Sequence, residues 1–336
     1  MAWAMAQPMI PPAHANDFLA SCGWKGARIQ PLVGDASFRR YFRVVDGERR
    51  AVLMDAPPPL EDVRPFVAVA EWLSTVGLSA PEIIARDVDH GLLLLDDFGE
   101  SRLREMLDED PTRERELYEL ATDVLVHLHS HPPMEGLRPH GLDQWLEELG
   151  LFTDWYCSAL GLEVDVESYR QAWTEVLEPV AKDGLGPVTV LRDYHAENLM
   201  LVRGRGGIRQ FGLLDFQDAL AGHPAYDLAS VLEDARRDVP PEIERQMIDR
   251  YVAATGAGEA FERAYWALAA QRNTRILGVF TRLWKRDSKP HYTAFQPRMW
   301  GLLERDLGRP ELEPVRRWFE ANVAAEHRAA PWATAK

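Results

Sequence analysis

Short apolar runs separated by polar turns dominate the first hundred residues. Four of these runs have the composition of strands, namely residues 38–45, 50–54, 82–85 and 92–95. Asp46-Gly47 between the first two runs is typical of a hairpin turn. Residues 63–76 carry apolar side chains at helical spacing until Gly77, which predicts one helix in this region. We expect the segment 96–99, which follows the fourth run, to be a hinge between this region and the rest of the chain.

After residue 100 the spacing of apolar positions becomes helical. Predicted helices cover residues 101–107, 113–130, 142–160, 169–180, 225–235, 242–254, 260–285 and 298–307. Three short apolar runs interrupt this series and predict short strands, at residues 188–191, 199–202 and 211–216. We therefore expect an α+β, bilobal protein, with a β-rich N-lobe over residues 1–97 and a larger, mainly helical C-lobe over residues 98–336.

Composition narrows the classes of partner. The 336 residues are 46% hydrophobic, enough for a substantial core. The 53 acidic residues outnumber the 38 basic residues and give a net charge of −15, so we expect neither nucleic-acid nor membrane partners. Cys22 and Cys157 cannot form a disulfide framework, and the N-terminal residues lack the pattern of a signal peptide. These features predict a cytoplasmic protein, and we expect a monomer.

One polar segment contains the residues that most clearly indicate a chemical function. Asp193 and Asn198 lie five residues apart between two predicted strands, in a segment that matches H-R-D-x-x-x-x-N except that Leu191 replaces the histidine. Phosphoryl transfer uses such an aspartate as the base for the acceptor hydroxyl, and the amide oxygen as a Mg²⁺ ligand. Asp215, at the end of the next apolar run, is the expected second ligand. The alternative is that Asp193 and Asp215 are ordinary loop acids that cap turns.

These motifs, together with Gly222-His223-Pro224-Ala225-Tyr226-Asp227, resemble the aminoglycoside phosphotransferase family of kinase-like enzymes over about residues 34–300. The resemblance implies a protein-kinase-like fold, ATP and Mg²⁺ as cofactors, Asp193 as the base, and Asn198 and Asp215 as metal ligands. It also implies that Asp227 braces the catalytic loop, although an acid that faces the dipole of a helix start is an equally good interpretation.

The first predicted hairpin lies where such enzymes cover the phosphates of the nucleotide. Expected nucleotide-binding residues are Gly34, Ser37, Phe38, Arg39, Arg40, Arg43, Asp96 and Phe98. Met54 occupies the position of the usual strand lysine and cannot pair with phosphates. We expect one of the three arginines to supply that charge, with Arg39 and Arg43 on one face of the strand and Arg40 on the other. The alternative is a non-catalytic, nucleotide-binding regulator.

A basic stretch over residues 271–289 indicates which kind of molecule could accept the phosphoryl group. Four of its arginines are spaced to share a helix face, namely Arg272, Arg275, Arg282 and Arg286. They predict a site for an anionic substrate group, or alternatively a solvated face that pairs with acids of the same lobe. Expected substrate-binding residues are His195, Glu197, Asp218, Arg272, Asn273 and Arg275.

With residues 34–43, 54–58 and 271–273, the chain is most similar to the anomeric N-acetylmuramate/N-acetylglucosamine kinases within that family. The resemblance implies ATP-dependent phosphorylation of the anomeric hydroxyl of an amino sugar, giving the sugar 1-phosphate in peptidoglycan recycling. A kinase for another small alcohol, such as an aminoglycoside, is the alternative enzyme.

Overall fold

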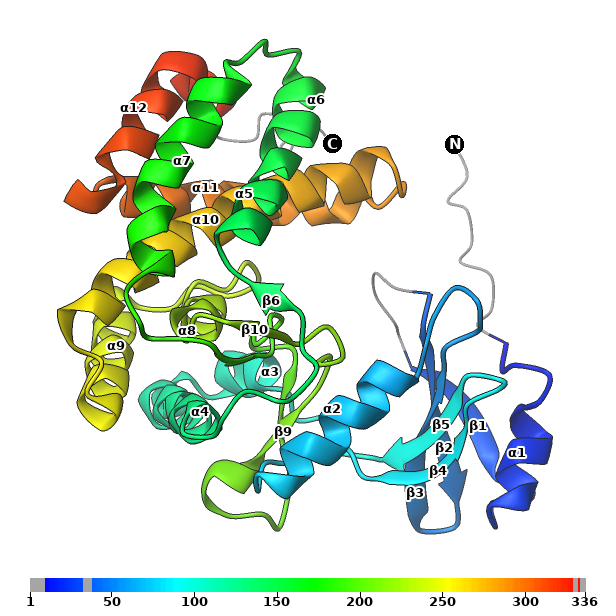
Figure 1. The fold of residues 1–336 in the computed structure, drawn as a ribbon. Coiled ribbons are helices and arrows are strands. Elements are labelled where there is room, and N and C mark those ends of the chain that lie inside the picture. Colours follow the sequence, from blue (N-terminus) through cyan, green and yellow to red (C-terminus); the bar gives the residue numbers. More distant parts are fainter. Residues whose placement is uncertain (1–9, 33–37, 329–331, 333–336) are drawn as a thin grey trace. The chain divides into compact units, whose positions relative to one another are not determined.

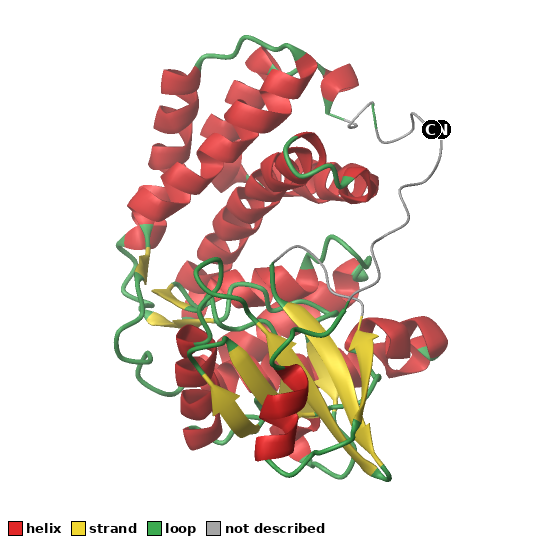
Figure 2. Ribbon diagram, turned by 90° about the vertical axis from the view of Figure 1, so that its right-hand side faces the viewer, coloured by secondary structure: helices red, strands yellow, loops and turns green. Residues whose placement is uncertain are grey.

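The computed structural model describes residues 10–32, 38–328 and 332. These residues form two compact units (Figure 1). Unit 1 comprises the described residues of 1–101 together with 200–218, and unit 2 comprises those of 102–199 and 219–336. Strands are concentrated in unit 1, whereas unit 2 is built mainly from helices (Figure 2). The order of a β-rich segment followed by a helical segment is the order that the apolar pattern predicts.

Unit 1 is organised around a five-stranded antiparallel sheet in the order β1-β2-β3-β5-β4. Its elements are α1 (Ala15–Ser21), β1 (Arg28–Leu32), β2 (Arg40–Asp46), β3 (Arg49–Asp55), α2 (Arg64–Thr75), β4 (Ile83–Asp87) and β5 (Leu92–Asp96). The predicted hairpin joins β2 to β3, with its turn at Gly47-Glu48 rather than at Asp46-Gly47. A second, two-stranded sheet pairs β8 (Leu199–Leu201), where the chain enters unit 1, with β9 (Phe211–Leu213).

Side chains along each strand point alternately to the two faces of the sheet, and the apolar ones on one face pack against α1. Phe42 and Val44 of β2, two residues apart, point to the same face and join Leu53 of β3 in one apolar cluster. Phe18 and Leu19 of α1 complete that cluster. Figure 1 shows α1 on one side of the sheet and α2 on the other, so helices cover both faces. The central strand β5 is accordingly almost fully buried, and β3 is mostly buried except at its start, where Arg49 and Arg50 are exposed.

Unit 2 consists of helices and one small three-stranded sheet in the order β6-β10-β7. Its helices are α3 (Leu103–Glu109), α4 (Glu114–His129), α5 (Leu142–Leu151), α6 (Ser158–Leu160), α7 (Val166–Ala181), α8 (Ala225–Leu232), α9 (Pro241–Thr255), α10 (Gly258–Lys285), α11 (Gln296–Leu307) and α12 (Glu313–Asn322). Its strands are β6 (Pro139–His140), β7 (Val188–Val190) and β10 (Leu220–Gly222). No helix in the described parts of the chain is long and apolar enough to cross a membrane.

The long helix α10 is the centre of unit 2, since it packs against α5, α8 and α11. Gly278 permits the closest of these approaches: a Cβ atom there would lie 2.3 Å from the backbone carbonyl of Leu151, at the end of α5. The single helix predicted over residues 142–160 is wrong in one respect. The chain passes from α5 into a π-helical turn, Phe152–Cys157, before α6 begins.

Candidate functional site

The segment 191–198 is held in a strained conformation by a buried acid. Arg192 has a φ of 72°, a left-handed value that non-glycine residues rarely adopt. Asp227, in the first turn of α8, accepts hydrogen bonds from the backbone N–H groups of Leu191 at 2.6 Å and Arg192 at 2.9 Å. Burial raises the pKa of Asp227 to about 7, and these two N–H groups oppose the rise. Asp227 therefore braces the loop from its position at the helix start, so the two interpretations of this residue describe one arrangement.

The braced loop presents Asp193 and Asn198 with their functional oxygen atoms uncommitted. The amide nitrogen of Asn198 donates to the backbone oxygen of Asp193 at 2.9 Å, which turns the amide oxygen the other way. Within the described part of unit 2, the Asp193 carboxylate accepts no hydrogen bond and forms no ion pair, and Asp193 is half-buried. A carboxylate that is neither neutralised nor fully solvated is suited to accept a proton from a bound hydroxyl group.

Two further contacts fix the rest of the loop. The Tyr194 hydroxyl donates to the backbone oxygen of Ala121 in α4 at 2.8 Å, and the Ala196 N–H donates to Asp234 at 3.0 Å. His195 is buried. Its burial, reinforced by the charges of Arg236 and Arg272, holds the pKa of His195 well below its usual value, so the ring is neutral at pH 7.

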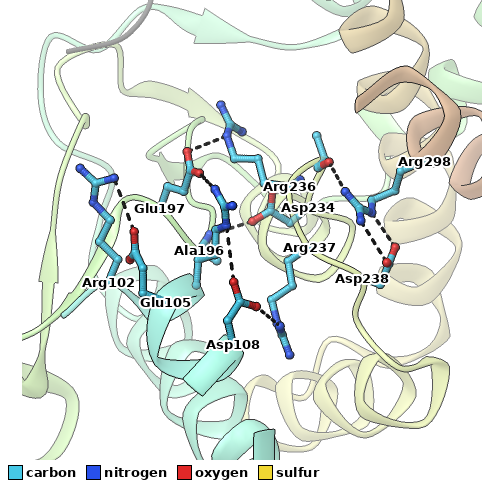
Figure 3. Close-up of polar contacts among 12 residues, drawn as sticks. Arg102, Glu105, Asp108, Ala196, Glu197, Asp234, Arg236, Arg237, Asp238 and Arg298 are labelled. Atoms are coloured by element: carbon cyan, nitrogen blue, oxygen red, sulfur yellow. Dashed lines mark hydrogen bonds and ion pairs between the residues drawn. The ribbon is translucent and has the colours of Figure 1, made fainter. Parts of the chain in front are cut away.

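Glu197 forms ion pairs with two arginines from different parts of the chain. Arg104 of α3 and Arg236, which follows α8, both form ion pairs with its carboxylate, the second at 2.8 Å. Figure 3 shows that this pair belongs to a wider network, in which Asp108 of α3 meets Arg237 at 3.0 Å. The network joins α3 and the segment after α8 to the loop, which favours a positioning role for Glu197.

Glu148 of α5 forms ion pairs with two guanidinium groups. Its Oε1 atom lies 2.9 Å from Nη2 of Arg192, and its Oε2 atom lies 3.4 Å from Nε of Arg275 on α10. Burial acts to raise the pKa of Glu148, but Arg275, His140 and Arg192 together lower it to about 2. Glu148 is therefore ionised throughout the physiological range, and it ties the catalytic loop to the two helices.

The two other acceptor residues predicted on α10 lie deeper. Arg272 is 3% exposed, and its Nη1 atom donates to the backbone oxygen of Glu233 at 3.2 Å. Asn273 is fully buried and donates to the carboxylates of Glu233 and Asp306 at 2.5 and 3.0 Å. Of the predicted α10 residues, only Arg275 is brought together with the loop through a shared side-chain partner.

Asp215 and Asp218 belong to unit 1, in the segment after β9. Asp215 has a φ of 56° and a side chain that is 44% exposed. Gln217 donates to Oδ1 of Asp215 at 2.8 Å and to Oδ2 of Asp218 at 3.2 Å, which orients both carboxylates. Nη2 of Arg39 lies 3.6 Å from Oδ1 of Asp215, and its Nε lies 3.8 Å from Glu61 of the loop before α2. The guanidinium group of Arg39 is thus next to the predicted metal ligand within the same unit.

The other two candidate arginines have short contacts elsewhere. Arg40 donates to Asp55, its cross-strand neighbour, at 2.8 Å. Arg43 pairs with Asp97 at 2.7 Å and with Glu100, and donates to the backbone oxygen of Gly99 at 3.1 Å. Arg43 therefore ties the sheet to the predicted hinge.

The predicted hinge is packed against the hairpin that contains β9. Arg205 pairs with Asp96 at 3.0 Å, and its guanidinium carbon lies 5.1 Å from the centre of the Phe98 ring. A Cβ atom on Gly212 would lie only 2.3 Å from that ring. Phe98 is consequently an interior residue of unit 1. Phe38 is exposed, and Gly34 and Ser37 lie outside the described residues.

Sequence reasoning missed the residues that hold the loop from other elements. These are Glu148, Asp234, Arg104 and Arg236. Each is one acid or arginine among many in a chain that is rich in both, and no local spacing distinguishes it. Only the packing of helices that are distant in sequence reveals its partner.

Comparison with known proteins agrees with this chemistry. Residues 28–266 match the phosphotransferase enzyme family. An N-acetylmuramate/N-acetylglucosamine kinase of Caulobacter vibrioides is 38% identical over 352 aligned positions, covering 93% of this chain and 96% of the relative. One of the same name from Pseudomonas aeruginosa is also 38% identical, covering 88% and 92%. A solved choline/ethanolamine kinase family protein from Mesorhizobium loti has a TM-score of 0.62 at 15% identity, covering 94% and 95%, which confirms the predicted kinase-like fold.

Proposed function

This chain belongs to the phosphotransferase enzyme family, and we propose that it transfers the γ-phosphoryl group of ATP to the anomeric hydroxyl of N-acetylmuramate or N-acetylglucosamine. The products are the sugar 1-phosphate and ADP, and the reaction serves the recycling of peptidoglycan sugars. The two relatives named for these sugars align with nearly the whole chain at 38% identity, and this supports the choice of acceptor.

The observation that carries the proposal is the conformation of the catalytic loop. Asp227 braces the strained turn at Arg192, and the loop then presents an Asp193 carboxylate with no partner in the described part of unit 2. Asp193 accepts the proton of the sugar hydroxyl group while the oxygen of that hydroxyl group bonds to the γ-phosphorus. The bond between that phosphorus and the oxygen bridging to the β-phosphate breaks, and the electron pair leaves with ADP. Fixing the base before the reaction removes an orientational cost from the barrier.

Asn198 and Asp215 are the residues that we propose to hold Mg²⁺. Both offer oxygen donors, which Mg²⁺ prefers, and the amide oxygen of Asn198 accepts no hydrogen bond from the described residues. Gln217 orients the carboxylate of Asp215. When bound, the metal ion neutralises phosphate charge as the leaving group departs.

Arg39 is our candidate for the charge that the missing lysine would supply. Arg40 and Arg43 form short contacts with Asp55 and Asp97, whereas the guanidinium group of Arg39 lies 3.6 Å from Asp215, the proposed metal ligand, where a charge for the phosphates is needed. Arg39→Met should raise the KM for ATP by about 10- to 100-fold, the loss expected for a charge-assisted hydrogen bond. Arg50→Met, on the exposed end of β3, is the matched control. Equal effects in the two variants would remove Arg39 from nucleotide binding.

The surroundings of the loop favour a neutral or anionic acceptor. Arg192 and Arg275 share the single carboxylate of Glu148, so this region repels a polycationic aminoglycoside. Of the six residues predicted to bind the acceptor, we propose that Arg275 and Asp218 contact it directly. For His195, Glu197, Arg272 and Asn273, the hydrogen bonds and ion pairs inside unit 2 support positioning roles.

The proposal is tested by ADP release from the full-length protein with Mg²⁺ and ATP, in the presence of each amino sugar and of kanamycin. Wild-type protein should turn over with one or both amino sugars. Asp193→Asn should lower kcat by about 10²- to 10⁴-fold while ATP affinity changes little, because only the proton acceptor is removed. Asp89→Asn, in an exposed turn of unit 1, is the matched control. Turnover with kanamycin alone, or a fully active Asp193→Asn variant, would contradict the proposal.

A further inference from the structure

Helix α10 carries a second arginine on the face that meets the loop. Arg282 follows Arg275 by seven residues, which is close to two helical turns, so the two side chains lie on the same side of α10. Arg275 marks that side, because its Nε lies 3.4 Å from Glu148 of α5, which also binds Arg192 of the loop. Arg282 thus extends a row of guanidinium groups that begins at the catalytic loop.

The row holds more positive than negative charge. Glu148 is shared by Arg192 and Arg275, with one of its oxygens next to each guanidinium group. Asp287 lies near Arg282 but is bound through both oxygens by Arg286, at 2.7 and 3.0 Å. The three guanidinium groups of Arg192, Arg275 and Arg282 therefore outnumber the two other nearby carboxylates, those of Glu148 and Asp193.

The Nε atoms of all three arginines are buried without a hydrogen-bond partner, but Arg282 is the member of the row that forms neither a hydrogen bond nor an ion pair with the described residues. Its Nε atom is buried and has no hydrogen-bond partner among the described residues, although the side chain as a whole is only half-buried. Burial, followed by the charges of Arg286 and Arg275, lowers the pKa of Arg282 below its ordinary value. A buried donor without a partner costs free energy, and a carboxylate that accepts from both edges of the guanidinium fork removes that cost.

We propose that Arg282, supported by Arg275, binds the carboxylate of an anionic acceptor sugar. The inference rests on the proposed function, and it selects between the two sugars: N-acetylmuramate carries a lactyl carboxylate and N-acetylglucosamine does not. Arg192 directly precedes Asp193 and shares Glu148 with Arg275, so the row begins next to the predicted base. The site therefore differs from the sequence prediction, because Arg272 is committed to the backbone of Glu233.

The experiment measures kcat/KM for both sugars in wild-type protein and in Arg282→Met, which keeps an apolar stem of similar length. The variant should lose about 10- to 100-fold with N-acetylmuramate and less than about threefold with N-acetylglucosamine, because only one sugar carries the anion. Arg282→Lys should recover part of the loss, since it restores the charge without the planar fork. Arg263→Met is the matched control, an exposed arginine on the same helix whose ion pair with Glu259 is 3.9 Å long.

A second comparison uses the methyl ester of N-acetylmuramate, in which the carboxylate is neutral. Wild-type protein should lose a similar factor with the ester, and Arg282→Met should show no further loss, because both changes remove the same interaction. Equal losses for both sugars in Arg282→Met, or additive losses with the ester, would overturn the proposal. Wild-type protein that phosphorylates neither sugar would instead overturn the proposed function, so the two failures are distinguishable.

Discussion

Glu148 offers a quantitative test of how the catalytic loop is held. The Glu148→Gln substitution keeps the shape of the side chain but removes the charge that neutralises Arg192 and Arg275. The pKa of Glu148 falls from an ordinary value of 4.5 to about 2 in the folded protein, and its side chain is only 15% exposed. At about 1.4 kcal/mol per pKa unit, this shift corresponds to roughly 3 kcal/mol of stability at neutral pH.

The sign of the pH dependence follows from the depressed pKa. Unfolded protein binds a proton at Glu148 at a higher pH than folded protein does, so the stabilisation is complete above about pH 4.5 and is lost as the pH falls towards 2. The difference in unfolding free energy between wild type and Glu148→Gln should therefore be about 3 kcal/mol at pH 7 and should shrink below pH 4.5. Urea unfolding followed by circular dichroism at 222 nm reports it, because most helices lie in unit 2.

Glu147→Gln is the control, since Glu147 is an exposed neighbour on the same helix. It should change stability by less than about 0.5 kcal/mol at any pH. If Glu148→Gln behaved like this control, or if its effect were the same at pH 7 and pH 3, the ion-pair account of Glu148 would be refuted.

Three further substitutions test other parts of the structure. Asp227→Asn should lower stability by about 1–3 kcal/mol and reduce kcat more than the KM for ATP, because the N–H groups of the strained turn lose an acceptor; urea unfolding and steady-state kinetics measure both. Gly212→Ala should cost about 1–3 kcal/mol in urea unfolding, and Phe98→Leu in the same chain should recover part of it. Arg43→Met should cost about 1–3 kcal/mol by removing the guanidinium partner of half-buried Asp97, with partial recovery in the double variant that adds Asp97→Asn.

The apolar pattern predicted the elements that contain an apolar stripe or run, including the short strands β7, β8 and β9, and it missed several more polar ones. Helices α4, α7, α9 and α10 follow the predicted ranges closely, because each buries a continuous stripe. α12 was missed because half of its residues are charged or polar, although Val315, Trp318 and Phe319 have helical spacing. β1 contains Pro31 and has no buried residue, so its strand character depends on pairing with β2.

The candidate site was predictable where chemistry is local in sequence. Asp193, Asn198 and Asp215 come from short motifs, and the enzyme class that these motifs implied is confirmed by the family match. The predicted basic face of α10 was less informative. Arg272 and Arg275 differ by about 60° around the helix, so Arg272 turns to the segment after α8 while Arg275 meets Glu148 on α5. Which arginine remains available depends on those neighbours, and no residue within α10 encodes it.

The central claim is that this chain phosphorylates an amino sugar at its anomeric hydroxyl with Asp193 as the base. Proton-coupled ³¹P NMR of the reaction of wild-type protein with ATP, Mg²⁺ and each amino sugar tests it most directly. A sugar 1-phosphate gives a doublet, because a single anomeric proton couples to the phosphorus. We predict that doublet with wild-type protein and no new signal over the same time with Asp193→Asn. A triplet from a 6-phosphate, or free phosphate and ADP without any sugar phosphate, would contradict the account.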